Sequence, residues 1–320
     1  MFVSVVIPTH NRAAKLRNLL TAIAAIDIPK GIQFEVIVVD NGSKDGSSSV
    51  CAEAEKALGI NLSRVFIGKP GKSGAANAGI RISRGDIVAL LDDDVYPSRD
   101  WLTTIASEFS SDPDLVLLCG RVELFNPNDF RISVRTLSSR ELFSTVSDAY
   151  NLFIGACLVM RRSVLTTARG FDTDFGPGAC ISAAEDADLI YRVALTGKRL
   201  VYSPQLLTYH DHGRRDADTV DRLRKVYISS RGAFFAKHIL RADVQVIKTM
   251  YWEIRSLLKN PATIDWRHLT WLICGFLIYT LLRFARIFNP LRWRKGMTGE
   301  GCAASCAGAA NIKFNAAGEI

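Results

Sequence analysis

Blocks of apolar and polar residues alternate along the first 120 residues, with the lengths of strands and helices. Apolar runs typical of buried strands occur at residues 3–7, 36–39, 62–67, 87–91 and 115–119. Segments with helical apolar spacing separate them, at residues 16–26, 47–58, 73–83 and 99–109. This alternation predicts βαβ units, and therefore an α/β fold built on a mostly parallel sheet.

The remaining sequence predicts further elements and three regions. Arg121–Asn151 has little periodicity and indicates a long excursion near the mouth of a site. Later patterns predict a strand at 152–160, a helix at 183–195, a short strand at 200–202 and a helix at 220–238. We expect an α/β domain over 1–240, basic, Trp-rich helices over 241–296, and a disordered Gly/Ala/Ser-rich tail over 297–320.

An acidic cluster, Asp92-Asp93-Asp94, directly follows the apolar run Ile87–Leu91. Like charges at the end of a buried strand repel one another and lose hydration, which favours a cation or a polar ligand beside them. Open α/β sheets bind ligands at this edge, and carboxylates are hard ligands for a divalent cation. Taken alone, a solvated acidic loop explains the cluster equally well.

Two other predicted strands end in polar residues of the same kind. The first is followed by Pro8-Thr9-His10-Asn11-Arg12, and the second by Asp40-Asn41-Gly42-Ser43. Parallel strands bring such ends to one edge, where Arg12 would neutralise a diphosphate and Asp40 would accept the imide N–H of a uracil-like base. Each motif alone is weak, since Asn-Gly-Ser is usually a turn. Their shared edge predicts a nucleotide site.

Five segments, in this order and spacing, resemble the inverting GT-A glycosyltransferases of family 2 over roughly residues 3–212. The segments lie at residues 4–12, 38–46, 71–79, 91–94 and 185–189. The resemblance implies a GT-A nucleotide-diphospho-sugar transferase fold, with a Rossmann-like mixed sheet and C-terminal helices. It also implies transfer of a sugar, with inversion, from a nucleotide-diphosphate donor to a hydroxyl group.

The resemblance assigns roles to individual residues. Asp186 corresponds to the general base that deprotonates the acceptor, although acidic residues at a helix start often serve only the helix dipole. Asp94 corresponds to a ligand of Mn²⁺ or Mg²⁺, and His210, 24 residues after Asp186, to a second ligand. The expected substrate-binding residues are Pro8, Thr9, Asn11, Arg12, Asp40, Lys72, Asn77, Asp92, Asp93, Gly155, Ala156 and Glu185.

The C-terminal third is basic and rich in tryptophan. Residues 212–296 hold 17 Lys and Arg against six Asp and Glu, and four of the five Trp lie at 252, 266, 271 and 293. The uncharged stretch Leu269–Leu282 has 14 residues, fewer than the ~17–25 of a transmembrane helix. We therefore expect an interfacial or re-entrant segment on an anionic membrane surface. The alternative is a helical hairpin buried against the α/β domain or a dimer partner.

The composition of the chain limits the expected cellular location and binding partners of the protein. Seven irregularly spaced cysteines and a chain that enters a strand almost at once favour a cytoplasmic protein, peripheral on the inner face of the membrane. We expect a nucleotide-diphosphate sugar, of UDP type, and a glycan or lipid-linked acceptor as partners, with a possible homo-oligomer and no nucleic acid. Two alternatives remain open: a catalytically inactive sugar-nucleotide-binding scaffold of this fold, and transfer of another group onto a surface polymer.

Overall fold

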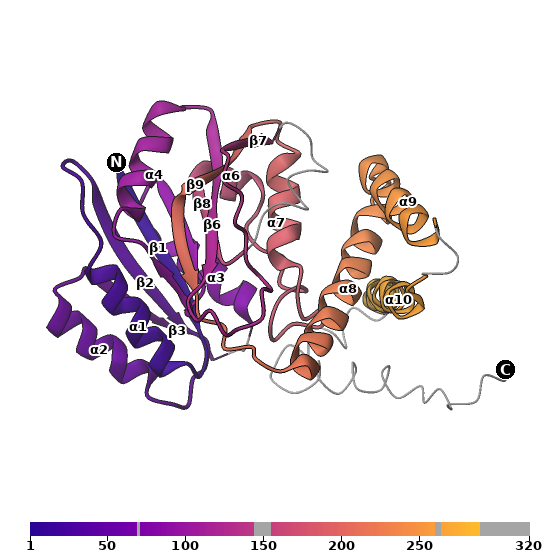
Figure 1. Cartoon of the computed structure of the whole chain (residues 1–320), viewed down its shortest axis with the longest axis horizontal. Coiled ribbons are helices and arrows are strands. Elements are labelled where there is room, and N and C mark those ends of the chain that lie inside the picture. Colours follow the sequence, from indigo (N-terminus) through magenta and orange to yellow (C-terminus); the bar gives the residue numbers. More distant parts are fainter. Residues whose placement is uncertain (69–70, 144–154, 260–263, 289–320) are drawn as a thin grey trace. The chain divides into compact units, whose positions relative to one another are not determined.

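The computed structural model describes residues 1–68, 71–143, 155–259 and 264–288 (Figure 1). The chain divides into two compact units, each described here by itself. Unit 1 holds Met1–Gly178 and Ala183–Arg224, and unit 2 holds Ala179–Ser182 and Lys225–Ile320. The domain boundaries expected at residues 240 and 296 stay predictions, and the expected tail lies outside the described residues.

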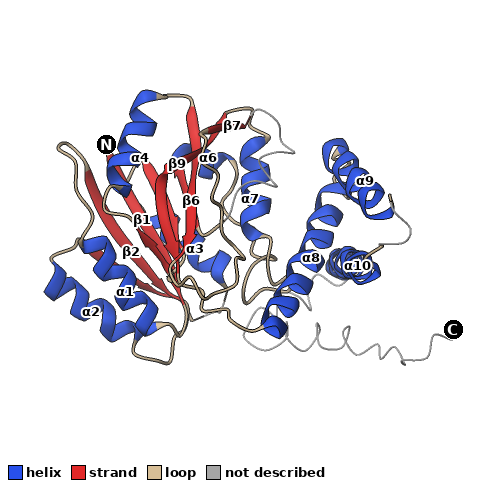
Figure 2. Cartoon of the chain, in the orientation of Figure 1, coloured by secondary structure: helices blue, strands red, loops and turns tan. Residues whose placement is uncertain are grey.

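Unit 1 is built on one nine-stranded sheet in the order β3-β2-β1-β4-β8-β6-β9-β5, with β7 paired to β9 (Figure 2). The strands are β1 (Phe2–Thr9), β2 (Gln33–Asp40), β3 (Leu62–Phe66), β4 (Ile87–Leu91), β5 (Val95–Pro97), β6 (Leu115–Leu124), β7 (Glu141–Phe143), β8 (Cys157–Arg161) and β9 (Arg199–His210). Among the described strands, β5, β7 and β8 run opposite to the other six. The expectation of an α/β fold with a mixed, mostly parallel sheet is confirmed.

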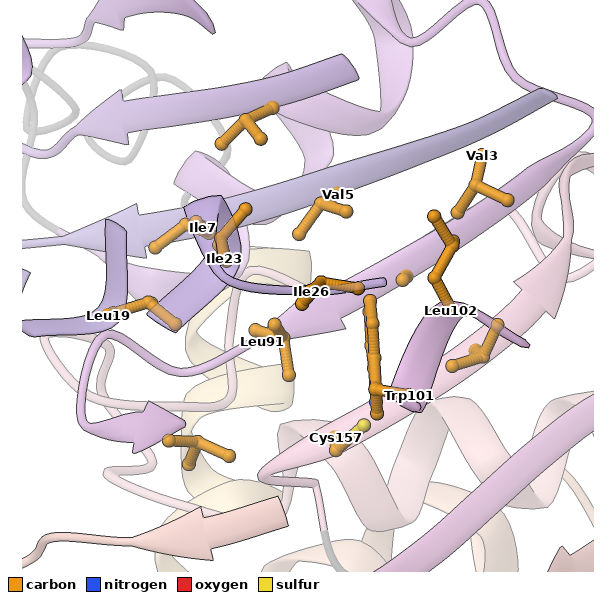
Figure 3. Close-up of a cluster of buried hydrophobic side chains, with 14 of the residues drawn as sticks. Val3, Val5, Ile7, Leu19, Ile23, Ile26, Leu91, Trp101, Leu102 and Cys157 are labelled. Carbon is orange, nitrogen blue, oxygen red and sulfur yellow. The ribbon is translucent and has the colours of Figure 1, made fainter. Parts of the chain in front are cut away.

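Helices cover both faces of the sheet and build two apolar cores. The described helices that lie wholly in unit 1 are α1 (Ala13–Ala24), α2 (Ser47–Leu58), α3 (Lys72–Ile82), α4 (Trp101–Ser111), α6 (Arg162–Thr167) and α7 (Glu185–Ala194). Helices α1, α2 and α4 pack on one face, where Trp101 is fully buried (Figure 3). Helices α3, α6 and α7 pack on the other. Burying both faces explains why the strand sequences are continuous apolar runs.

The register brings the polar strand ends predicted above to one edge. Thr9 pairs with Asp40 at the ends of β1 and β2, and Val6 pairs with Leu90, so the acidic cluster after β4 lies at the same end. The antiparallel strand β5 pairs Val95 with His210. Chain positions more than a hundred residues apart therefore meet beside the acidic cluster.

Several elements differ from the sequence-based expectation. The short strand expected at 200–202 is the 12-residue β9, and β5 was not expected at all because three residues carry no periodic signal. The strand expected at 152–160 begins at Cys157. Part of the excursion expected over 121–151 belongs to β6 and β7. Residues 144–154 lie outside the described part of the chain.

In unit 2, three helices pack closely. Helix α8 (Ala217–Ile239) enters the unit at Lys225 and is followed by α9 (Val244–Leu258) and α10 (Trp266–Phe288). A Cβ on Gly232 of α8 would lie 1.9 Å from the carbonyl oxygen of Leu272, and one on Gly275 of α10 would lie 1.7 Å from that of Ser229. The two backbones therefore touch at the middle of α10.

The prediction that the apolar C-terminal segment is too short to cross a membrane is wrong. Helix α10 continues through Arg283 and Arg286 and has 23 residues, about 34 Å at 1.5 Å per residue, enough to cross ~30 Å of hydrocarbon. Its mean hydropathy over 18 residues is 1.6, and 17% of that window is buried. By length and composition alone, α10 could span a membrane.

Among the cysteines that the structure describes, one departs from the expectation of free thiols. Cys51, Cys119, Cys157 and Cys274 carry free thiols, the first three of them buried. Cys180 is disulfide-bonded, whereas the sequence favoured reduced cysteines.

Candidate active site

The acidic cluster is held in place by the end of β1. Thr9 donates a hydrogen bond of 2.8 Å from Oγ1 to Asp93 Oδ2, and Arg12 donates one of 3.1 Å to Asp93 Oδ1. Arg12 also forms an ion pair with Asp94. Burial raises the pKa of Asp93 to about 6, although Arg12 acts to lower it. The buried carboxylates of Asp93 and Asp94 therefore share the guanidinium of Arg12 as their counter-ion at this edge of the sheet.

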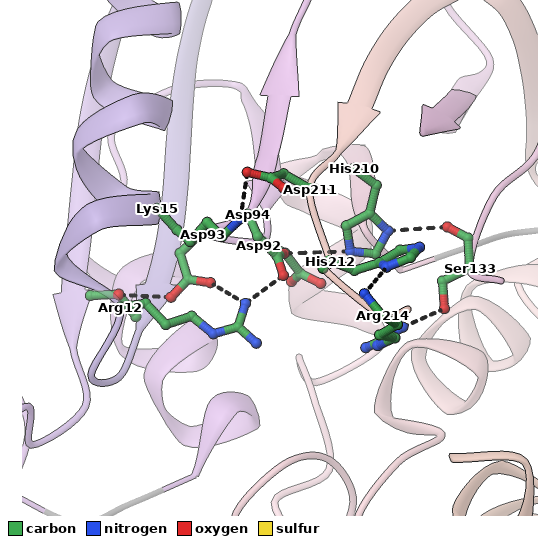
Figure 4. A network of polar contacts seen from close by, with 12 residues as sticks. Arg12, Lys15, Asp92, Asp93, Asp94, Ser133, His210, Asp211, His212 and Arg214 are labelled. Atoms are coloured by element: carbon green, nitrogen blue, oxygen red, sulfur yellow. Dashed lines mark hydrogen bonds and ion pairs between the residues drawn. The ribbon is translucent and has the colours of Figure 1, made fainter. Parts of the chain in front are cut away.

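Asp94 and His210 meet because β5 pairs with the end of β9. His210 Nε2 lies 3.5 Å from Asp94 Oδ1, and both side chains are buried (Figure 4). Burial acts to raise the pKa of Asp94, but the hydrogen bond and charge of His210 in its protonated form, together with the charge of Arg12, hold it well below its usual range. On its other side, His210 Nδ1 lies 3.1 Å from the carbonyl oxygen of Ser133.

This pair fits a divalent cation as a two-residue ligand set. A carboxylate and an imidazole nitrogen are both ligands that Mn²⁺ accepts, and phosphate oxygens can complete its shell. Within the described residues no cluster of three His, Cys, Asp or Glu side chains is arranged around one point. The structure thus brings together the two expected ligands, Asp94 and His210, without a third.

A second ionic group lies at the start of α3 and α7. Lys72 Nζ lies 2.6 Å from Asp92 Oδ1 and 3.3 Å from Glu185 Oε1. Burial acts to lower the pKa of Lys72, but the charges of Asp92 and Glu185 raise it well above its usual value. Burial raises the pKa of Glu185 to about 7, against the opposing charge of Lys72. Lys72 therefore stays charged beside the acidic cluster.

Asp186, the expected base, is oriented by two backbone groups. Gly155 donates its N–H to Asp186 Oδ2 at 2.8 Å, and Ala187 donates its N–H to Oδ1 at 2.8 Å. A Cβ on Gly155 would lie 2.2 Å from Asp186 Oδ2, so only glycine permits this approach. The carboxylate is thereby held in one orientation at the first turn of α7.

The ends of β1 and β2 form a cradle beside the acidic cluster. Asp40 Oδ1 accepts a hydrogen bond of 2.8 Å from the Ser43 N–H, and Asn11 Oδ1 accepts one of 2.7 Å from the Lys44 N–H. Asn11 has a φ of +52°, and Pro8 precedes it at the end of β1. Asp40 also lines a cavity of about 420 Å³, together with Val38, Ser48, Cys51, Glu55, Leu62, Arg64, Val65 and Phe66.

Two of the expected substrate-binding residues, Asn77 and Ala156, make contacts within the fold. Asn77 donates to the carbonyl oxygen of Phe171 and accepts its N–H, both at 2.8 Å. Ala156 is buried in the apolar core, and its carbonyl oxygen accepts the N–H of Asp92 at 3.2 Å. A substrate role for either residue stays a prediction.

The sequence reading missed several residues around this site. Lys15 of α1 forms an ion pair with Asp211, and Tyr96 donates a hydrogen bond of 2.9 Å to the same carboxylate. Ser133 contacts His210 through its backbone. Lys15 and Ser133 belong to none of the matched motifs. The contact of Ser133 uses its backbone carbonyl, which every residue type has, so the sequence could not indicate it.

Comparisons with known proteins identify the family. The glycosyl transferase family 2 model matches residues 4–167, and the glycosyl transferase family group 2 model matches residues 87–293. The chain therefore belongs to glycosyl transferase family 2.

Relatives and solved structures agree with this family. The chain is 31% identical over 268 residues to a pre-mycofactocin glycosyltransferase of Mycobacterium tuberculosis, covering 80% of this chain and 53% of that protein. It is 33% identical over 160 residues to glycosyltransferase AglE of Haloferax volcanii, covering 48% and 52%. The chain thus spans about half the length of these curated relatives.

Solved structures share the fold. A mannosyltransferase of Pyrobaculum calidifontis, in complex with GDP-Man and Mn²⁺, superposes with a TM-score of 0.60 at 24% identity, covering 96% of this chain and 85% of that one. TarS of S. aureus, residues 1–349, gives 0.57 at 19% identity, covering 90% and 74%. At these identities the likeness establishes the GT-A fold alone.

Proposed function

We propose that this protein is an inverting glycosyltransferase that moves a sugar from a nucleotide-diphosphate donor to a hydroxyl group of an acceptor. The observation that carries the proposal is the joint position of Asp94, His210, Arg12 and Lys72 at the edge of the sheet where α/β folds bind ligands. Membership of glycosyl transferase family 2 supports it.

Direct displacement with inversion needs one base on the acceptor side and no covalent nucleophile. Asp186 takes this role, since the N–H groups of Gly155 and Ala187 hold its carboxylate in place to accept the hydroxyl proton. The leaving diphosphate carries negative charge that Arg12 and Lys72 stabilise on the donor side. Glu185 lies 3.3 Å from Lys72 Nζ, so its carboxylate, when ionised, partly neutralises the positive charge that Lys72 presents to the diphosphate.

A divalent cation completes this arrangement, and Asp94 and His210 are the residues that would hold it. When bound, it supplies positive charge to the leaving diphosphate. The support is the fit of a buried carboxylate oxygen and an imidazole nitrogen that face each other at 3.5 Å. The mannosyltransferase with the same fold was solved with Mn²⁺.

The donor belongs to the nucleotide-diphosphate sugars, and we propose a UDP-type base recognised by Asp40 beside its cavity. TarS was solved with UDP and with UDP-GlcNAc, and the mannosyltransferase with GDP-Man. A guanine nucleotide is therefore the competing donor. The acceptor we propose is a lipid-linked or cell-surface glycan, because unit 2 carries an exposed apolar surface that suits contact with a membrane.

That surface is an apolar stripe along α10. Six apolar residues at helical spacing lie on one side of α10, and each is about half exposed or more to solvent. They are Trp266, Ile273, Leu277, Leu281, Phe284 and Phe288. Arg267 stacks on Trp271 at 4.9 Å, and Arg255 of α9 stacks on Trp252 at 5.1 Å. Paired cations and indole rings are typical of the headgroup region on the cytoplasmic face of a membrane.

We propose that α10 lies along the membrane surface and does not cross it. The reason is the helix packed against its middle: α8 touches α10 at Gly232 and carries Arg231, whose ion pair with Glu253 of α9 measures 2.8 Å. A spanning α10 would draw these charges into the hydrocarbon, which is costly. Lying flat, α10 buries its stripe while the charges remain at the interface.

The test is a donor screen. Purified full-length protein with Mn²⁺ should release nucleoside diphosphate from one nucleotide sugar out of a panel, in the presence of a membrane extract as acceptor source. Asp186→Asn should lower kcat by ~10²–10⁴ and leave donor affinity unchanged. Asp27→Asn, an exposed carboxylate paired with Arg99, is the matched control. Donor binding without turnover in the wild-type protein would instead support the inactive scaffold.

A further inference from the structure

The ring of His210 is oriented from behind by a backbone carbonyl. Its Nδ1 lies 3.1 Å from the carbonyl oxygen of Ser133, which can only accept a hydrogen bond, so Nδ1 carries the proton. In the neutral ring, Nε2 then presents its lone pair toward Asp94 Oδ1 at 3.5 Å. This is the tautomer that a metal ligand needs, and such a partner on the other nitrogen is what orients ligating histidines.

Ser133 provides that carbonyl from an unusual backbone conformation. Its φ is +53°, in the left-handed region that residues other than glycine seldom adopt. Such strain persists where neighbouring contacts impose it. Arg214 Nη1 donates to Ser133 Oγ at 3.2 Å, and the backbones of Arg135 and Val122 exchange hydrogen bonds of 2.8 and 2.9 Å. Figure 4 shows Ser133 between His210, which its carbonyl oxygen contacts, and Arg214, which contacts its side chain.

A buried carboxylate fastens the other end of the segment. Asp129, whose side chain is 0% exposed, accepts the N–H of Gly213 at 2.9 Å and Arg215 Nε at 2.7 Å. Phe130 donates its N–H to the carbonyl oxygen of Arg214 at 2.9 Å. Residues 129–133 are therefore tied to residues 213–215, which follow His210 in the chain.

We propose that the segment 129–133 positions the metal ligand His210, with Ser133 fixing the ring tautomer and Asp129 anchoring the segment. The inference rests on the proposed metal site. Ser133 and Asp129 are positioning residues, because they act through His210 alone. Loss of such an outer partner typically weakens metal affinity by about 10–100-fold.

The experiment compares two substitutions at Ser133. Valine resists a positive φ and should turn the carbonyl away from His210, whereas glycine adopts that φ freely. In Ser133→Val, the Kd for Mn²⁺, measured by electron paramagnetic resonance with saturating UDP or GDP, should rise about 10–100-fold. Ser133→Gly loses the same hydrogen bond from Arg214 but adopts this φ freely, so its Kd should rise far less than that of Ser133→Val. The matched control is Ala242→Val in unit 2, where φ is +58°, which should lose stability without any change in Mn²⁺ binding.

A second measurement needs no metal. Long-range ¹H–¹⁵N spectra of histidine-labelled protein should show the Nδ1–H tautomer of His210 in the wild type and its loss in Ser133→Val. If the valine variant does not fold, Asp129→Asn takes its place, because it removes the charge that anchors Arg215. An unchanged tautomer and an unchanged Kd in a variant that folds would overturn the inference. If the wild-type protein itself binds no Mn²⁺, the proposed metal site fails, and the role of Ser133 in metal binding fails with it.

Discussion

Adding one methyl group at Gly155 should disable the proposed base. A Cβ at this position would lie 2.2 Å from Asp186 Oδ2, 2.5 Å from its Cβ and 2.6 Å from its Cγ. Ordinary van der Waals contact starts near 3.4 Å, so the clash requires a displacement of about 1 Å. Because the Cβ of Asp186 is as close as its carboxylate, rotation of the side chain cannot relieve the overlap.

The expected loss of kcat in Gly155→Ala follows from how strongly the catalytic rate depends on the position of the base. A misplacement of about 1 Å costs roughly 10²-fold in rate. We therefore expect kcat of Gly155→Ala to fall by about 10²-fold, at the lower end of the ~10²–10⁴-fold loss for removal of a general base. Donor affinity should change little, because Arg12 and Lys72, the residues proposed to hold the diphosphate, belong to other elements.

The assay is nucleoside diphosphate release at saturating donor, combined with calorimetric donor binding and a thermal melt. The matched control is Gly68→Ala, where the nearest contact of an added Cβ with the described part of the chain is the Phe66 side chain at 3.9 Å. A Gly155→Ala variant that folds and keeps the wild-type kcat would refute the reasoning. The acceptor proton would then go to another group, with Glu185 the next candidate.

Three further predictions concern the cation, a buried carboxyl and the membrane. Asp94→Asn, or chelation of the wild type by EDTA, should lower activity by more than about 10²-fold, and full activity in excess EDTA would exclude the metal. The raised pKa of Glu185, about 7 against 4.5 unfolded, means the folded state binds more protons between these values, so stability falls as pH rises. From pH 5 to 8 the unfolding free energy should fall by about 1–3 kcal/mol more in wild type than in Glu185→Gln, by urea titration; parallel curves would contradict this. Leu277→Glu with Leu281→Glu should abolish flotation with phosphatidylglycerol vesicles, whereas Arg283→Gln should only weaken flotation at low salt and make it less dependent on salt; unchanged flotation in the double variant would identify α10 as a packing helix.

The local order of the chain was accessible from sequence because it depends on short-range patterns. Apolar runs such as Ile87–Leu91 and helical spacing in Ser47–Leu58 match observed elements to the residue. The acidic cluster, Asp40 and Arg12 could be assigned to one edge, since parallel strands leave their carboxyl ends together. The positions of these elements and the shared edge could be predicted because they depend only on residue periodicity and on the direction of the strands.

Helix α10 shows where the prediction from sequence was incomplete. Counting uncharged residues gave 14 over Leu269–Leu282, but a helix extends through Arg283 and Arg286, because long cationic side chains cost little at exposed helix ends. Which side of α10 is free was decided by the close approach of α8 at Gly232 and Gly275. Counting uncharged residues in the sequence reveals neither where α10 ends nor which of its sides is exposed.

The finer geometry of the site was decided by tertiary structure alone. His210 reaches Asp94 because the three residues of β5 pair with the end of β9, and so short a strand has no sequence signal. Ser133 acts through a backbone carbonyl, which every residue type possesses. The chain thus specifies by itself which chemical groups it carries and in what order. Their mutual distances arise only when long-range pairing brings the segments together, since contacts between distant residues depend on the fold and not on local pattern.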